Sequence, residues 1–458
     1  MRGGTVSASV VLELQENQLA IRSGRSRFFR RPEFWMVVAG FALRMAVLPL
    51  LIGEQLSPER DHWRFGYEAG KIAKSIVQGH GFSSPLFSDT GPTAWMTPVY
   101  PYIVAGFFKV FGLYTLASAV ALLTFNALVS ALTAIPIFLI ANRSFGERTA
   151  RWAGWGWVVF PYAIYFPMER LWETWLATLL LSCLFLLGLK LEAEPASLGG
   201  WIGFGALWGL AALTSPTVLS ILPLWGAWIC CQLRRQGRNW LVPSAATLLT
   251  LTLVVSPWFV RNYVTFHKFI PFRDNMGMVL RLGTKGNSNH WAQYGLGPWH
   301  DEDEWQQFQK LGELGYMAKE KRQAFQAIAR DPVWYVWTSF RRMIFIWSGY
   351  WSFDRAYLRQ EPLDPPNIFF SSTCTLLALL GLWRAFRRSY DCAMPYLLAL
   401  FSFPAIYYLT SPEAYYRRPI DPLFVILIAY ALSAMKHPRE RQKTRWTEER
   451  EMEELLVT

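Results

Sequence analysis

The sequence is poor in charged residues and in cysteine for a chain of its length. Charged residues make up 17% of the 458 residues, whereas a soluble domain carries about 25%. The five cysteines lie in or beside apolar runs, and their spacing fits neither a zinc site nor a redox motif. We expect all five to be small buried hydrophobic side chains: Cys183, Cys230, Cys231, Cys374 and Cys392.

The sequence also lacks an internal repeat, a low-complexity segment and a glycine-rich phosphate loop. The missing phosphate loop argues against a bound nucleotide, and we predict no cofactor. The acidic run from Asp301 to Glu304 could suggest a metal site. Consecutive acids cannot all face one ion, and Asp303 suits a helix N-terminus instead, so a metal site is the disfavoured alternative there.

Apolar and aromatic residues are abundant instead. Hydrophobic residues make up 52% of the chain, which contains 23 Trp, 19 Tyr and 32 Phe. The net charge of +12 comes from basic residues in short segments between apolar runs, a pattern that fixes membrane topology. We therefore predict an all-α integral membrane protein with about ten transmembrane helices, nine to eleven being compatible with the runs, and no nucleic-acid partner.

Ten apolar runs are long enough to be read as spans, and several tolerate an internal proline. They are 34–53, 114–141, 151–166, 171–191, 201–213, 216–232, 241–260, 368–383, 395–409 and 422–435. A shorter apolar piece, 99–111, is expected at the interface or partway into the membrane. The segment 332–351 is apolar but carries Arg341 and Arg342 at its centre. Two central arginines would cost at least roughly 5 kcal/mol, so we place this segment at the interface.

The positive-inside rule orients the chain in the plasma (inner) membrane. It puts the segment 1–33, the short basic loops and the charged tail 436–458 in the cytoplasm, with residues 34–435 forming the membrane domain. The first span is then an uncleaved signal anchor. The loops 54–97 and 261–330 face outward, and the second half of the latter has the spacing of one or two amphipathic helices.

The outward loops hold most of the polar motifs. The first contains an acid–aromatic stretch, Arg60–Glu68, followed by Gly79-His80-Gly81 and by Pro98-Val99-Tyr100-Pro101. Three further motifs follow along the chain: Phe145-Gly146, Pro257–Tyr263 and Tyr415–Ile420. The order of all these motifs and the side of the membrane predicted for each agree with one known family. In these motifs the chain resembles polytopic glycosyltransferases of the C-type fold. Within that fold it resembles the protein O-mannosyltransferases and lipid A aminoarabinose transferases, and is thus similar to glycosyltransferase family 39.

This resemblance implies transfer of a sugar from a polyprenyl-phosphate carrier, on the outer face, with inversion at the anomeric carbon. A carboxylate must take the proton of the acceptor hydroxyl. The matching residue is Asp61, but Glu68 is a rival because His62 stands where the family has a second acid. A loop aspartate at position 61 could instead cap a helix. Glu173 is a further catalytic candidate, or else it forms a helix pair with Arg170.

Cations on the outer side are candidates for binding the lipid phosphate, since planar guanidinium groups match a diester. They are Arg417 and Arg418, and less strongly Arg261; the first two could instead touch bulk lipid headgroups. Tyr67 and Tyr100 complete the predicted site of the first loop, whereas His62 and His80 are read as interfacial residues and Arg44 as paired inside the bundle.

Two other functions stay open from the sequence. A transporter or lipid flippase usually shows internal repeats and broken helices at the midplane, and a non-catalytic scaffold would need no particular carboxylate. The sugar and the acceptor, whether lipid, glycan or protein, are not determined by the sequence.

Overall fold

The computed structural model describes residues 31–52, 65–194, 197–284, 297–299, 301–351, 355–360, 364–410 and 416–435. Within these ranges every regular element is a helix, and one isolated β-bridge joins Ser83 to Pro92. The predicted all-α class is confirmed. Several residues named from the sequence lie outside the described ones: the segment 1–30, Asp61 with His62, Tyr415, and the tail 436–458.

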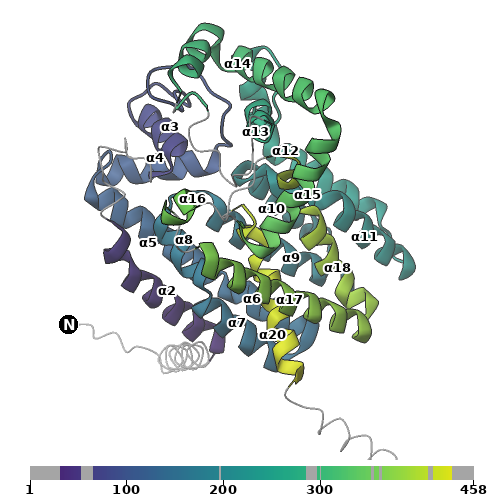
Figure 1. Cartoon of the computed structure of the whole chain (residues 1–458). Coiled ribbons are helices and arrows are strands. Elements are labelled where there is room, and N and C mark those ends of the chain that lie inside the picture. Colours follow the sequence, from purple (N-terminus) through teal and green to yellow (C-terminus); the bar gives the residue numbers. More distant parts are fainter. Residues whose placement is uncertain are drawn as a thin grey trace, which may run out of the picture.

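The helices pack into one bundle, with α3, α13 and α14 gathered over one end of it (Figure 1). The first half contains α2 (Pro32–Leu51), α3 (Tyr67–Val77), α4 (Val99–Phe111), α5 (Leu116–Leu132), α6 (Ala134–Phe145), α7 (Glu147–Val159), α8 (Pro161–Glu169), α9 (Thr174–Ala193), α10 (Leu198–Thr214), η4 (Pro216–Ser220) and α11 (Leu222–Arg235). The second half contains α12 (Leu241–Phe266), α13 (Met276–Leu282), α14 (Glu302–Arg330), α15 (Pro332–Ser348), α16 (Arg355–Gln360), α17 (Asp364–Arg388), α18 (Tyr390–Ser402), α19 (Ala405–Leu409), η5 (Arg418–Ile420) and α20 (Asp421–Met435).

Six helical stretches are long and apolar enough to cross a membrane. They are α2, α5 with α6, α9, α12, most of α17, and α18 with α19. The chain is therefore an integral membrane protein of α-helices. The count of about ten spans stays a prediction, because other predicted spans are divided. The span 151–166, for instance, is built from α7 and α8, which part at Phe160, whose backbone is extended as expected before Pro161.

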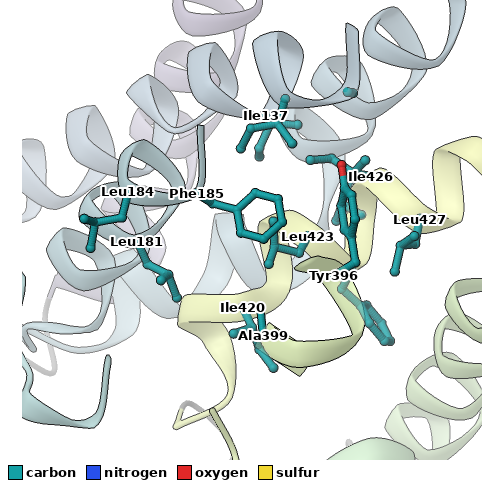
Figure 2. Close-up of a cluster of buried hydrophobic side chains, with 14 of the residues drawn as sticks. Ile137, Leu181, Leu184, Phe185, Tyr396, Ala399, Ile420, Leu423, Ile426 and Leu427 are labelled. Atoms are coloured by element: carbon teal, nitrogen blue, oxygen red, sulfur yellow. The ribbon is translucent and has the colours of Figure 1, made fainter. Parts of the chain in front are cut away.

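Apolar side chains of α6, α9, α18 and α20 meet at the centre of the bundle (Figure 2). Phe185 of α9 meets Tyr396 of α18 edge-on, with ring centroids 5.1 Å apart. Ile137 and Ile426 are fully buried beside them. Because lipid is as apolar as these side chains, their burial yields little hydrophobic free energy, and close packing must hold the helices together.

Three glycines allow the closest helix contacts. A Cβ at Gly205 of α10 would lie 2.3 Å from the carbonyl oxygen of Thr247 in α12. A Cβ at Gly381 of α17 would lie 2.1 Å from the carbonyl oxygen of Leu427 in α20. A Cβ at Gly209 of α10 would lie 2.6 Å from the Cβ of Val254 in α12. Small residues at these positions let the helix backbones approach, as in other membrane bundles.

Arg44 is a buried charge inside α2. Its guanidinium donates to Ser130 Oγ at 2.9 Å, to the Gly40 carbonyl at 2.8 Å and to the Trp157 carbonyl at 3.4 Å. The prediction that Arg44 pairs inside the bundle is confirmed, with a hydroxyl and carbonyls as the partners. These contacts tie α2 to α5 and α7.

The short basic loops gather at one end of the bundle. There Arg143 pairs with Glu194 at 2.6 Å, and Arg238 donates to the Glu192 carbonyl at 2.9 Å. The end of α11 also meets the start of α18, where Gln232 donates to Asp391 at 2.6 Å. We call this the basic end.

The two long polar loops meet at the opposite end, which we call the loop end. There the first loop packs on α12, since Arg261 donates to the Thr93 carbonyl at 2.7 Å. The 20 residues of α9 separate the two ends, a rise of about 30 Å and the thickness of a bilayer core. Both loops thus lie on one side, as the topology requires, although the orientation in a membrane stays a prediction.

The second long loop carries the predicted amphipathic helices. α14 consists of two helices that meet at Gly312, whose φ of +67° breaks the helical backbone. Asp301 caps its start by accepting from the backbone N–H groups of Asp303 and Glu304. The expected helix N-terminus at the acidic run is confirmed, with the cap at Asp301 and Asp303 in the first turn.

α15 covers most of the segment that we placed at the interface. Arg342 is buried and donates to the carbonyl of Gly283 in the second long loop. Val333, Val336 and Trp337 are exposed on another side of the helix. The contact with the loop keeps one of the two central arginines bonded to protein, and the interfacial position of α15 stays a prediction.

Candidate functional site

Glu68 is carried by α3, the short helix of the first long loop. This helix begins after Gly66, whose φ is +73°. A Cβ at Gly66 would lie 2.0 Å from the carbonyl oxygen of Leu171, so only glycine allows this approach. The close contact brings the start of α3 against the chain just before α9, where Glu173 lies.

The Glu68 carboxyl is poised to exchange a proton near neutral pH. Its pKa is raised to about 7: burial is the main cause and the neighbouring Glu173 carboxylate adds to it, whereas its backbone hydrogen bond, Arg273 and Trp95 oppose the rise. The side chain remains partly exposed. A carboxyl with this pKa can both accept and release a proton at physiological pH.

Glu173 and Arg273 form a buried ion pair. Arg273 Nη2 donates to Glu173 Oε1 at 2.5 Å, and the two side chains are 20% and 5% exposed, respectively. The same Nη2 lies 3.2 Å from Thr97 Oγ1, whose hydroxyl donates to the Thr214 carbonyl at 2.8 Å. The pair therefore joins residues of both long loops and the start of α9.

This pairing differs from the helix pair that the sequence offered for Glu173. Arg170 forms its ion pair with Glu169 instead, at 2.9 Å. Glu173 Oε2 is buried and receives no hydrogen bond from the described residues, and the buried Nε–H of Arg273 donates none to them. Glu68, Glu173 and Arg273 together are called the loop-end site below.

Arg261 anchors the first loop. Its guanidinium donates to the carbonyls of Thr93 and Phe82, at 2.7 and 2.8 Å, and lies 5.0 Å from the ring centre of Trp258. With two carbonyls and an aromatic ring as partners, Arg261 has a clear role in holding the loop. A role in binding phosphate stays a prediction.

Arg417 and Arg418 lie buried at the start of α20, being 3% and 5% exposed. Both bind Asp421, at 3.2 and 2.8 Å. Arg418 also lies over the ring of Tyr162, 3.7 Å from its centre. Nη2 of Arg417 is buried with no hydrogen-bond partner among the described residues. The pair is thus neutralised in part by Asp421, and contact with bulk lipid headgroups does not fit this burial.

An aromatic pair connects these arginines with the loop-end site. Tyr407 stacks on Tyr416, which precedes Arg417, with ring centroids 4.8 Å apart. The Tyr407 hydroxyl lies 3.1 Å from Thr217 Oγ1 and within electrostatic reach of Glu173 and Arg273. Glu68 and Glu173 are thus parts of one region with Arg417 and Arg418.

The two predicted tyrosines have different surroundings. Tyr67 is buried beside Glu68, and its ring meets Phe87 edge-on at 5.9 Å. Tyr100 is also buried, and its hydroxyl lies 3.5 Å from Asn126 Oδ1 and within electrostatic reach of Glu173. His80 is exposed, as an interfacial residue would be.

The sequence reading missed four residues of this region: Trp95, Arg273, Asp274 and Glu313. All lie in the two long loops, where charged residues are common. Arg273-Asp274 is an oppositely charged dipeptide near the end of α12, but nothing in its spacing sets it apart. No three His, Cys, Asp or Glu side chains of the described ranges form a group that could hold a metal ion.

Comparison with known proteins finds solved structures of a similar fold and no match by sequence. No protein-family model and no curated protein matches the sequence. Among solved structures, the ArnT of Cupriavidus metallidurans bound to undecaprenyl phosphate is similar over 90% of this chain, at 16% identity and a TM-score of 0.50. The oligosaccharyltransferase AglB of Archaeoglobus fulgidus, in complex with an inhibitory peptide and a dolichol-phosphate, matches 89% of this chain at 13% identity and a TM-score of 0.49.

The chain spans 61% of the ArnT chain and 50% of the AglB chain. At such low identity the likeness to ArnT concerns the fold alone. It confirms at that level the resemblance found in the sequence: this protein has the fold of the C-type membrane glycosyltransferases.

Proposed function

We propose that this protein is a membrane glycosyltransferase that moves a sugar from a polyprenyl-phosphate carrier to an acceptor hydroxyl on the outer face of the plasma membrane. The observation that carries the proposal is the loop-end site. Two carboxyls of separate segments, Glu68 and Glu173, lie there beside one guanidinium, and the pKa of Glu68 is about 7. Proton transfer and stabilisation of a leaving phosphate need these groups.

The reaction would be a single displacement. The acceptor oxygen attacks the anomeric carbon from the face opposite the phosphate, the carbon–oxygen bond to the phosphate breaks, and the sugar configuration inverts. A carboxylate of the first loop takes the hydroxyl proton, and the polyprenyl phosphate leaves with the bonding electrons. Glu68 and Asp61 both remain candidates for this base. Glu173 would then orient the acceptor or Arg273.

The leaving phosphate needs a cation close to the base. Arg273 meets this need best, because its side chain is partly exposed and its Nη2 alone makes the two hydrogen bonds to Glu173 and Thr97. Arg417 and Arg418 lie deeper, bound to Asp421. They would contribute positive potential, and the unpartnered Nη2 of Arg417 would offer one more donor.

The fold supports a lipid-linked donor. ArnT, which shares the fold, was solved with undecaprenyl phosphate. The loop-end site and the basic end are one bilayer thickness apart. A carrier with its phosphate at the membrane surface would therefore present its sugar at the loop-end site. The described site contains no feature that selects a particular sugar or acceptor.

The test is a transfer assay with the purified protein. The full chain is incubated with several polyprenyl-phosphate sugars and membrane extract, and the released polyprenyl phosphate and the glycosylated product are measured. Glu68→Gln and Asp61→Asn are compared with Asp303→Asn, an exposed acid of α14 that serves as the matched control. The variant that removes the base should lose transfer by roughly 10²- to 10⁴-fold, while the control keeps it.

Full activity in both carboxylate variants would reject the mechanism. A flux assay in liposomes separates the proposal from a transporter or flippase, which would move substrate without forming a covalent product. The anomeric configuration of the product, read by NMR, tests inversion.

A further inference from the structure

Asp274 follows Arg273 and is a buried carboxylate without an ordinary partner. Neither of its oxygens is exposed, and neither receives a hydrogen bond from an N–H or hydroxyl donor of another described residue; the donor within reach is its own backbone N–H. The group within hydrogen-bonding reach is the carboxyl of Glu313, from α14. Two buried carboxyls in contact repel if both are ionised, so the arrangement needs one proton between them.

Glu313 also holds the first long loop. Its Oε2 accepts from the hydroxyl of Thr93 at 2.6 Å, and its Oε1 accepts from the backbone N–H of Ala94 at 2.7 Å. The Asp274 backbone N–H donates to the Ala94 carbonyl at 3.1 Å. The Asp274–Glu313 pair thus ties residues 93 and 94 of the first loop to two parts of the second.

Two residues next in sequence to these contacts, Arg273 beside Asp274 and Trp95 beside Ala94, lie in the region of the candidate site. Arg273, on one side, binds Glu173. Trp95, on the other side, is buried, and its backbone N–H donates to Thr93 Oγ1 at 3.0 Å. The Trp95 side chain lies within hydrogen-bonding reach of Glu68. A shift of the Asp274–Glu313 pair would therefore move Arg273, which binds Glu173. It would also move Trp95, which adjoins Glu68.

We propose that Asp274 and Glu313 share one proton and form a carboxyl latch that joins the two long loops and positions Arg273 and Trp95 in the loop-end site. Both are positioning residues, since neither is placed against the reacting atoms. The effect of the latch on sugar transfer rests on the proposed function, whereas its effect on the stability of the loop end does not.

The charges around the latch favour a retained proton. Burial raises the pKa of Asp274 well above its usual range, and the Glu313 carboxyl raises it further. Burial also raises the pKa of Glu313, against the hydrogen bonds of Thr93 and Ala94 and the positive charge of Arg261. From the first loop, Thr93 and Ala94 contribute no charge. From α12, Arg261 is the charged group that faces the pair. Arg273, adjacent in sequence, is bound to Glu173.

The raised pKa values fix the direction of the pH dependence. A group whose pKa is higher in the folded state stabilises it at low pH, and this stabilisation is lost as pH rises through the folded-state pKa. The latch therefore holds below the raised pKa of the pair. As the pH rises through that pKa, the shared proton is lost, the two carboxylates repel, and Arg273 and Trp95 lose their support.

The experiment combines two readouts on the full purified chain in detergent: thermal melting and sugar transfer, each across pH 5–10. In the wild type both should fall together on the alkaline side of the transition in which the pair loses its proton. Asp274→Asn supplies an amide N–H to Glu313 in place of the shared proton, so it should remove the alkaline fall while keeping neutral activity. Asp274→Ala supplies no donor and should lower transfer by roughly 10- to 100-fold through misplacement of Arg273. Asp303→Asn is the control on α14.

The latch is supported if Asp274→Ala loses sugar transfer and Asp274→Asn keeps it. Glu313→Gln, which can donate to Asp274, should show the same loss of the alkaline fall and covers the case that one variant fails to fold. The latch is overturned if Asp274→Asn keeps the wild-type pH dependence of melting, or if it loses transfer as fully as Asp274→Ala. If the wild type transfers no sugar but melts as described, the proposed function fails and the latch stands.

Discussion

The sharpest prediction concerns the ion pair between Arg273 and Glu173. Replacing Arg273 by Met leaves the Glu173 carboxylate, which is 5% exposed, without its cation. Breaking a buried pair in this way costs about 3–5 kcal/mol. Because the Arg273 side chain is 20% exposed, solvent already screens part of the interaction, and we expect the lower end of that range. The Arg273→Met variant should therefore have a free energy of unfolding about 3 kcal/mol lower than that of the wild type.

The assay is a double-mutant cycle followed by thermal unfolding in detergent. It uses Arg273→Met, Glu173→Gln and the double variant, with Arg322→Met, an exposed arginine of α14, as the control. The double variant removes both charges and should regain most of the stability that the arginine variant loses. Equal destabilisation of the single arginine variant and the double variant would refute the reasoning.

Three further predictions concern the site, the packing and the topology. If Glu68 is the base, the transfer rate should rise with pH with a midpoint near pH 7, because a carboxyl with a pKa of about 7 must lose its proton to act. Glu68→Gln should abolish this acid limb. A pH–rate profile of each protein measures it. Gly205→Ala should destabilise the protein by about 1–3 kcal/mol through overpacking against α12, whereas Gly203→Ala on the same helix, where a Cβ meets nothing within 4 Å, should be neutral or slightly stabilising in the same melts. A cysteine at exposed Asp89 of the first loop should react with an impermeant thiol reagent added outside intact cells, and one at Gln236 of the basic end should react only after lysis; the opposite pattern would put the loop-end site in the cytoplasm.

Local features of the sequence were enough to predict the helical membrane class and the approximate positions of most helices. Apolar runs of about 20 residues can satisfy their backbone in lipid only as helices, so length and composition carry that information. α9 and α12 match predicted spans to within a few residues at most of their ends. The same local chemistry placed a helix N-terminus in the acidic run that Asp301 caps.

Beside Asp61, the polar outward loops and the family resemblance also pointed to Glu68 and Glu173 as candidate acids. They could not identify the cation that joins the two. Arg273 lies 100 residues after Glu173, and no periodicity links positions so far apart. The arginines that the sequence did single out, Arg417 and Arg418, have Asp421 as a partner.

The sequence alone therefore determined which segments are helices and which loops hold the polar chemistry. Only the tertiary structure decided which side chains meet. Thr93 and Glu313 are 220 residues apart, and their hydrogen bond exists because α3 and α14 cover the same end of the bundle. The proton affinities of Glu68, Asp274 and Glu313 follow from burial and from neighbouring charges, and both of these arise only when the two long loops pack together.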